Sequence, residues 1–129
     1  MKKILSIVAL LVVVIAIITS QILLIHCPHK LAFNAGTYEV QVDGHNDIIR
    51  VGVTFSDSSI VAINVLEQHE TPQIGAIVFD KLIPEIIRAN GLGVDAVSGA
   101  TVTSQALKKA VMEAAEQAGV SDPKLFRKA

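Results

Sequence analysis

Residues 95–104 read D-A-V-S-G-A-T-V-T-S and lead directly into a helical pattern, Q-A-L-K-K-A-V-M-E-A-A-E-Q. Four hydroxyl side chains gather at the start of this expected helix: Ser98, Thr101, Thr103 and Ser104. A single hydroxyl is enough to cap a helix, and Ser98, Thr101 or Thr103 would serve. The simplest interpretation is therefore a helix start in which one hydroxyl caps and the others are ordinary polar residues.

The same residue types are also typical of a phosphate site. A helix N-terminus offers unpaired backbone N–H groups and the positive end of a dipole, and small residues such as Gly99 and Ala100 let a phosphate approach closely. Asp95 would repel a bare phosphate, so such a site would need a metal or a partner protein at some stage. The residues alone leave the cap and the phosphate site equally open.

Two other motif-like patterns fail on their context. Gly91, Gly93 and Ala96 satisfy G-x-G-x-x-A, but this dinucleotide fingerprint requires a preceding strand and a βαβ unit, and here a helical pattern precedes it. Ser98 lacks the G-x-S-x-G elbow of a hydrolase nucleophile, and no histidine has an obvious orienting acid. We therefore expect no catalytic residue.

The segment H-E-T-P-Q-I-G begins at His69 but is not the zinc motif H-E-x-x-H, because Gln73 stands where the second histidine is needed. The residues favour a solvated loop around Glu70, in which Pro72 holds Thr71 extended. Gly75 would let its backbone approach a ligand or a neighbouring element closely.

The N-terminal segment is strongly apolar. Between Ile4 and Ile25 the only polar residues are Ser6, Thr19, Ser20 and Gln21. A helix over these residues is long enough for a bilayer core of about 30 Å. A signal peptide is the alternative, but the stretch is too long and no A-x-A site follows. We expect a single-pass anchor in the cell membrane, with Lys2 and Lys3 in the cytoplasm and the C-terminal domain outside it.

Composition excludes further classes of partner and site. The net charge is −1 and no basic stripe is present, so no nucleic-acid partner is expected. The single cysteine, Cys27, cannot form an internal disulfide. Cys27, His26 and His29 are too close together in the sequence to complete a tetrahedral metal shell readily. We therefore expect a free or acylated thiol and no metal site.

After an anchor and juxtamembrane segment over residues 1–29, residues 30–129 predict one domain of α+β class. Alternating patterns predict antiparallel strands over residues 38–42, 50–55 and 60–66, the last apolar on both faces and well covered, with turns at D-G-H-N-D and S-D-S-S. A helix follows Pro72; Pro84 should break or kink it, and Asn90 and Gly91 should end it. The last helix should run from about Thr101 to Gln117, buried along a stripe of Ala106, Leu107, Ala110, Val111, Ala114 and Ala118. Gly119 should end it, and Pro123 should prevent a restart. We expect a small antiparallel sheet with helices on one face.

The stretch D-A-V-S-G-A-T resembles the flavinylation signature D-x-x-[S/T]-G-A-T of the FMN-binding domain family, which includes flavin-carrying subunits of the sodium-pumping NADH:quinone reductase and of the Rnf complex. The resemblance runs from G-T-Y-E-V near Gly36, through V-L-E-Q-H-E-T-P-Q-I-G, to the helix ending near Gly119. It implies FMN joined by a phosphoester to Thr101, installed by an FAD:protein FMN transferase that uses magnesium-bound FAD and releases AMP.

The resemblance also implies roles for neighbouring residues. Those that match the rest of the signature would shape the phosphate pocket or be read by the transferase: Asp95, Ser98, Gly99 and Ala100. The E-T-P-x-I-G loop, with Glu70, Thr71 and Gly75, would lie beside the flavin. Family members often have glycine where this chain has Gln73, which bears on the contact of this loop with the flavin and not on the attachment site.

The implied function is that of a membrane-anchored electron-transfer flavoprotein without substrate turnover of its own. Electrons would come from a membrane dehydrogenase or a quinone-linked donor and pass to an extracytoplasmic acceptor. Two alternatives are a module that binds FMN or another phosphate ligand non-covalently, and a structural subunit of a membrane redox complex.

Overall fold

The computed structural model describes residues 1–25 and 30–129. The chain divides into two compact units, Met1–Lys30 and Leu31–Ala129. The expectations for Cys27, His26 and His29 lie outside the described residues.

The first unit contains a single helix, α1 (Lys2–Ile25). Its stretch Lys2–Ser20 has a mean hydropathy of 2.7, and none of its side chains is buried. Within the described part of the chain, α1 is the one helix long and apolar enough to cross a membrane. A signal sequence would share its length and composition.

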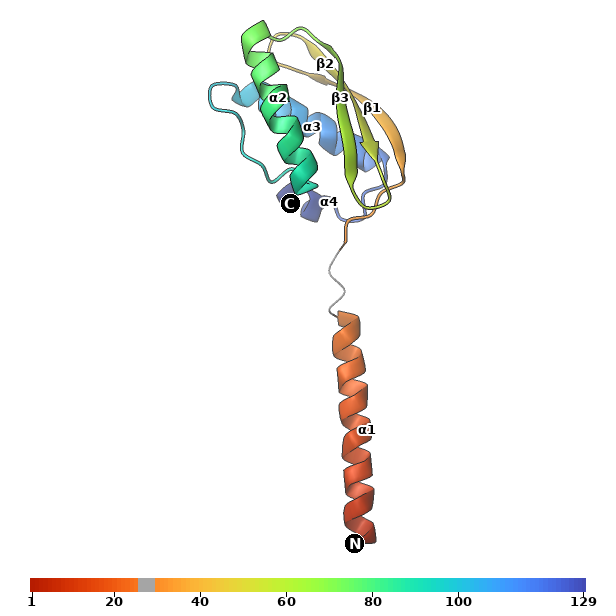
Figure 1. Ribbon diagram of the computed structural model, residues 1–129. Helices are drawn as coiled ribbons and strands as arrows, with labels where there is room; N and C mark the ends of the chain where they lie inside the picture. Colours follow the sequence, from red (N-terminus) through yellow and green to blue (C-terminus); the bar gives the residue numbers. More distant parts are fainter. Residues whose placement is uncertain (26–29) are drawn as a thin grey trace. The chain divides into compact units, whose positions relative to one another are not determined.

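The second unit begins with three consecutive antiparallel strands, β1 (Gly36–Asp43), β2 (Ile48–Phe55) and β3 (Ile60–Gln68) (Figure 1). The central strand β2 buries Ile49, Val51, Val53 and Phe55 on one face, as the alternation of the sequence predicts. Register pairs β2 residue Val51 with Val40 of β1 and Val65 of β3, so the apolar side chains of the three strands share that face.

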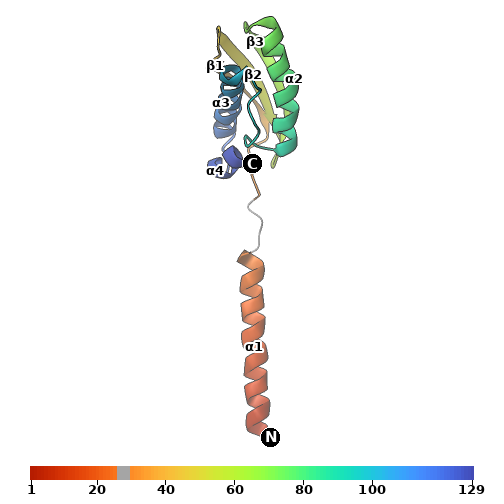
Figure 2. The same ribbon diagram turned by 90° about the vertical axis from the view of Figure 1, so that its left-hand side faces the viewer.

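Two helices cover this face. Figure 2 shows α2 (Pro72–Ala89) and α3 (Thr101–Gln117) side by side over the sheet. Helix α3 packs against β1 and β2, and α2 packs against β3. All six residues of the predicted stripe of α3 are buried: Ala106, Leu107, Ala110, Val111, Ala114 and Ala118. The predicted α+β class, with helices on one face of an antiparallel sheet, is confirmed.

The prediction of a well-covered third strand is wrong. Val61 and Leu66 of β3 are 55% and 47% exposed. Each lies at a position where the β2–β3 register shifts, and β3 is an edge strand whose outer face has no covering layer among the described residues. Only the inner face of β3, with Ile60 and Ile63, reaches the core.

Two predictions about prolines are also wrong. Pro84 does not divide α2, which is continuous. Both Pro84 and Asp80 are exposed, so the carbonyl of Asp80 that loses its helical partner can be hydrated, while Leu82 and Ile86 stay buried on either side. Pro123 does not prevent a restart: it opens the short helix α4 (Pro123–Lys128), because proline at a first helical position gives up no hydrogen bond.

Helix ends are fixed as the sequence suggests at two positions. Asn90 ends α2 in the left-handed conformation, with φ of 52°. Its side chain accepts a hydrogen bond from the Ile60 N–H and donates one to the Ser58 carbonyl, which ties α2 to the β2–β3 turn. Gly119, with φ of +68°, follows the end of α3.

The buried stripe of α3 generates a stability prediction. Leu107 is fully buried, so Leu107→Ala should lower the free energy of unfolding by about 2–5 kcal/mol through lost burial and a residual cavity. Denaturant unfolding of the full chain in mild detergent measures this. Lys109→Ala on the exposed side of the same helix should change it by less than about 1 kcal/mol. Equal effects of both variants would contradict the assigned packing.

Candidate functional site

A pocket of about 360 Å³ lies at the start of α3. Its lining comes from three separate segments: the β1–β2 turn, the junction of β3 with α2, and the first turn of α3. The residues are His45, Glu70, Thr71, Ile74, Gly99, Ala100, Thr101, Val102 and Thr103. The D-A-V-S-G-A-T and E-T-P-x-I-G segments therefore meet at one site.

A turn sets the entry into α3. The Ala100 N–H donates to the Val97 carbonyl at 3.0 Å, and Gly99 between them has φ of +79°. This is the third position of a β-turn, where type II geometry requires a positive φ and so favours glycine. Steric crowding does not explain the glycine, because a Cβ at Gly99 would meet nothing within 4 Å.

The four hydroxyls divide into two groups. Two are buried and engaged: Ser104 Oγ donates to the Ala100 carbonyl and accepts from the Val97 N–H, and Thr103 Oγ1 donates to Glu70 Oε2 at 2.6 Å. Ser98 and Thr101 are exposed, and neither hydroxyl makes a hydrogen bond to the described residues. Of the two, Thr101 is the one that lies inside the first helical turn.

The expectation that one of these hydroxyls caps α3 is wrong. The N-cap residue is Ala100, and no side chain of the described residues accepts a hydrogen bond from the first turn. The first N–H with a helical acceptor is that of Ser104, which donates to the Ala100 carbonyl. The N–H groups of Thr101, Val102 and Thr103 therefore remain available to an anion at this helix start.

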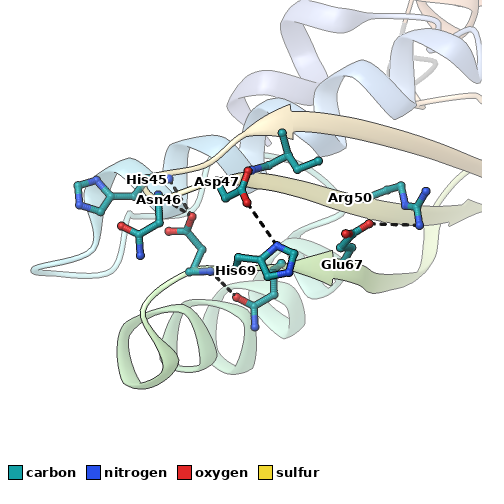
Figure 3. Close-up of polar contacts among 9 residues, drawn as sticks. His45, Asn46, Asp47, Arg50, Glu67 and His69 are labelled. Carbon is teal, nitrogen blue, oxygen red and sulfur yellow. Dashed lines mark hydrogen bonds and ion pairs between the residues drawn. The ribbon is translucent and has the colours of Figure 1, made fainter.

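Glu70 lies at the centre of the site and is only 5% exposed, which corrects the expectation of a solvated loop. Its Oε1 accepts from the N–H groups of His45 at 2.9 Å and Asn46 at 3.1 Å (Figure 3). Its Oε2 accepts from the Thr103 hydroxyl. Burial alone would raise the pKa of Glu70. The hydrogen bonds from Thr103 and from the backbone of Asn46, His45 and Asp47 outweigh burial and hold this pKa below its usual value of 4.5.

The rest of the E-T-P-x-I-G segment packs around this carboxylate. Thr71 is extended, with φ of −54° and ψ of 122°, and its Oγ1 accepts from Asn46 Nδ2 at 3.1 Å. Gly75 does not line the pocket. A Cβ on Gly75 would lie 2.7 Å from Glu70 Cβ, so glycine is needed for the close approach of α2 to Glu70.

Apolar side chains surround the start of α3. The second unit exposes five large apolar residues among those described: Val61, Leu66, Ile74, Ile77 and Val102. Three of them lie at this site. Ile74 and Val102 line the first pocket, and Ile74 and Ile77 line an adjoining pocket of about 250 Å³ that also includes Val97, Ser98, Gly99 and Ala100. A planar aromatic ligand would find apolar contacts on both sides of the Gly99–Ala100 backbone.

Asp95 is exposed and lines neither of these pockets. Conversely, sequence reasoning assigned no role in the site to His45, Ile74 or Val102. The available signal for Ile74 and Val102 was an apolar residue next to a motif. Nothing in the sequence indicated that the turn carrying His45 would close over the helix start.

The Glu70 contacts predict a pH-dependent contribution to stability. Because the pKa of Glu70 is lowered in the folded state, its ionised form stabilises the fold above the unfolded value near 4.5, and this contribution is lost as pH falls through the lower folded value. At pH 7, Glu70→Gln should lower the free energy of unfolding by about 1–3 kcal/mol. Below a pH of about 4.5, the difference in the free energy of unfolding between wild type and Glu70→Gln should become smaller.

Denaturant unfolding of the full chain at several pH values tests this. The matched control is Glu67→Gln, because Glu67 forms an exposed ion pair with Arg50 at 3.4 Å and should contribute less than about 1 kcal/mol. A gap between wild type and Glu70→Gln that stays constant down to pH 3 would contradict the assigned role of the charge.

Known proteins are similar in sequence to parts of this chain. The chain is 36% identical over 99 residues to the NADH:acrylate oxidoreductase of Vibrio harveyi, covering 77% of this chain and 10% of that protein. It is 32% identical over 82 residues to an uncharacterised protein of Treponema pallidum (strain Nichols), covering 64% and 23%. It is 35% identical over 78 residues to the urocanate reductase of Eggerthella lenta, covering 60% and 13%. The chain therefore spans less than a quarter of the length of each of these relatives.

The pocket and both of its motif segments fall inside a single match to a family model. That match covers residues 44–116, more than half of the chain, and the family is described as an FMN-binding domain. It includes the β1–β2 turn, the Glu70 segment and the whole of the start of α3. The chain belongs to the FMN-binding domain family.

Proposed function

We propose that this protein is an electron-transfer flavoprotein that carries FMN covalently on Thr101 and is held in a membrane by α1. Family membership gives the cofactor. The observation that carries the attachment is the state of the hydroxyls: Thr103 and Ser104 are buried and engaged, whereas Thr101 is exposed and unpartnered in the first turn of α3.

The helix start suits a phosphoester on this oxygen. A phosphate on Thr101 Oγ1 would lie beside the N–H groups of the first turn, none of which is used by a side-chain cap. The buried Glu70 keeps its negative charge, and the groups that donate hydrogen bonds to both of its carboxylate oxygens offset part of its repulsion of a phosphate. The apolar side chains of Ile74, Ile77 and Val102 would contact the isoalloxazine ring.

Attachment requires an activated phosphate, which we assign to magnesium-bound FAD on an FAD:protein FMN transferase. The Thr101 oxygen would form a bond to the phosphorus on the flavin side of the pyrophosphate. The bond from this phosphorus to the AMP half breaks, AMP leaves with the electron pair, and the hydroxyl proton passes to solvent. Asp95 and Ser98 are exposed beside Thr101, so the transferase can reach this segment in the folded chain.

Covalent attachment favours a role as carrier. Bound FMN accepts and donates electrons, and the protein holds it without needing free FMN in its surroundings. The relatives named for acrylate and urocanate reduction contain a segment similar to this chain within much longer proteins. This supports transfer to or from an oxidoreductase, with a membrane dehydrogenase or quinone-linked donor on one side and an extracytoplasmic acceptor on the other.

Variants of Thr101 test the covalent bond. The full chain is produced with the transferase, denatured in sodium dodecyl sulfate and examined for flavin fluorescence on the polypeptide. Wild type and Thr101→Ser should retain flavin, because both have a hydroxyl at this position, and Thr101→Val should lose essentially all of it. Ser98→Ala, the control at the other exposed hydroxyl, should retain it.

The outcomes separate the proposal from its alternatives. Retained fluorescence in Thr101→Val would overturn the attachment site. A wild-type protein that is yellow when native and loses all its flavin on denaturation would identify a non-covalent FMN module. Protein that stays colourless with FMN and the transferase present would identify a structural subunit with a degenerate site.

The anchor is tested separately by extraction of membranes at alkaline pH. The full chain should stay in the membrane pellet and keep its N-terminal residues, because the stretch Lys2–Ser20 has a mean hydropathy of 2.7. A variant lacking residues 1–29 should move to the soluble fraction. Mature protein that begins after the apolar stretch would instead identify α1 as a cleaved signal sequence.

A further inference from the structure

We propose that His45 binds the phosphate of FMN. The inference rests on the proposed attachment of FMN to Thr101. His45 lies in the turn between β1 and β2, far from the signature in sequence, and lines the same pocket as Thr101. His45 lies outside both the D-A-V-S-G-A-T and the E-T-P-x-I-G segments, so its role would be an additional cofactor contact.

Most polar side chains that line the pocket already have hydrogen-bond partners. Glu70, Thr71 and Thr103 all have hydrogen-bond partners within the described chain. Two lining side chains have polar groups without such a partner, the hydroxyl of Thr101 and the imidazole of His45. If Thr101 is the point of attachment, His45 is the remaining polar side chain that faces the cofactor.

Backbone hydrogen bonds hold His45 at the pocket. Its N–H donates to Glu70 Oε1 at 2.9 Å, and the same carboxylate binds Thr103 two residues after Thr101. The turn is also closed by the Gly44 N–H, which donates to the Asp47 carbonyl at 2.8 Å. Figure 3 shows the His45 ring at the tip of this turn, directed away from the other histidine, His69.

The charge of His45 also favours a phosphate. His45 is the one lining residue that can become positive, and an N–H donor with a positive charge makes a stronger hydrogen bond to a phosphate than a neutral donor does. Two other titratable groups of these segments have partners of their own. Glu70 is satisfied within the pocket, and Asp47 on the same turn lies 3.6 Å from His69 Nδ1. Histidine changes charge near neutral pH, so the phosphate contact should depend on pH in that range.

The test follows the phosphorus signal of the loaded full chain in detergent, after denatured samples have shown that the flavin is covalently retained. A phosphodiester keeps one negative charge between pH 5 and 8, so a ³¹P chemical shift that titrates in this range reports a neighbouring group. Wild type should show a single titration. His45→Gln should abolish it, and the control His69→Gln, which removes the histidine paired with Asp47, should leave it in place.

Affinity provides a second readout. In a Thr101→Val background at pH 6, His45→Gln should weaken FMN binding by about tenfold, the value expected for one hydrogen bond to a charged group, and should leave riboflavin binding unchanged. His45→Lys, which keeps the positive charge, should restore most of the loss. His45 is exposed, so these changes leave the core intact.

Each contrary result has a distinct meaning. Failure to retain flavin in wild type overturns the proposed attachment and leaves the phosphorus experiment without a sample. Retained flavin with a titration that persists in His45→Gln overturns the assignment of His45. Equal loss of FMN and riboflavin affinity would overturn the phosphate contact and assign the side chain to the ring.

Discussion

The Glu70 carboxylate is the contact on which the geometry of the site depends. Its side chain carries a negative charge although the residue is only 5% exposed, and hydrogen-bond donors from two separate segments surround it. Removing a donor would leave a buried charge partly unsatisfied, which is costly, so the turn at residues 44–47 and the start of α3 are held at fixed positions. Packing of α3 on the sheet fixes the layers of the domain. The hydrogen bonds of Glu70 fix the positions of the segments that line the pocket relative to one another.

This arrangement explains why several hydroxyls cluster before one helix. Thr103 serves Glu70, and Ser104 fastens the turn at Val97–Ala100 to the first helical turn. With these roles taken and no side-chain cap present, the first N–H groups and the Thr101 hydroxyl face the pocket. The site is thus prepared for an anion and for a bond to an exposed oxygen at the same place, which is what a phosphoester to FMN requires.

Much of the fold follows from periodicity. The alternation of β2 over residues 50–55 and the stripe of α3 each arise from a single dominant pattern, and both patterns were predicted. The failures at Val61, Leu66 and Pro84 share a cause, which is what does or does not lie next to these residues in three dimensions. Pro123 differs, because a proline at a first helical position gives up no hydrogen bond. A pattern of apolar residues cannot distinguish an edge strand from a covered one. A proline in the sequence does not reveal whether the carbonyl that it leaves unpaired, four residues earlier, faces water.

The site was predictable to the extent that it follows the chain. Thr101, Gly99 and Ala100 form one continuous segment, and the resemblance to a family pointed to them directly. Glu70 was placed in a solvated loop because its partners, His45 and Thr103, are 25 and 33 residues away in sequence. The conformational role of Gly75 could be anticipated, but only the packing identifies Glu70 as the neighbour it must accommodate.

The central claim is that FMN is joined to the oxygen of Thr101 and to no other hydroxyl of the cluster. Tandem mass spectrometry of peptides from transferase-treated protein tests it most directly, because fragmentation distinguishes Ser98, Thr101, Thr103 and Ser104. The account predicts that the added mass of an FMN ester is found on Thr101 alone. An FMN ester on Thr103 or Ser104, which are buried and hydrogen-bonded here, or the absence of any ester on a peptide spanning residues 95–104, would contradict it.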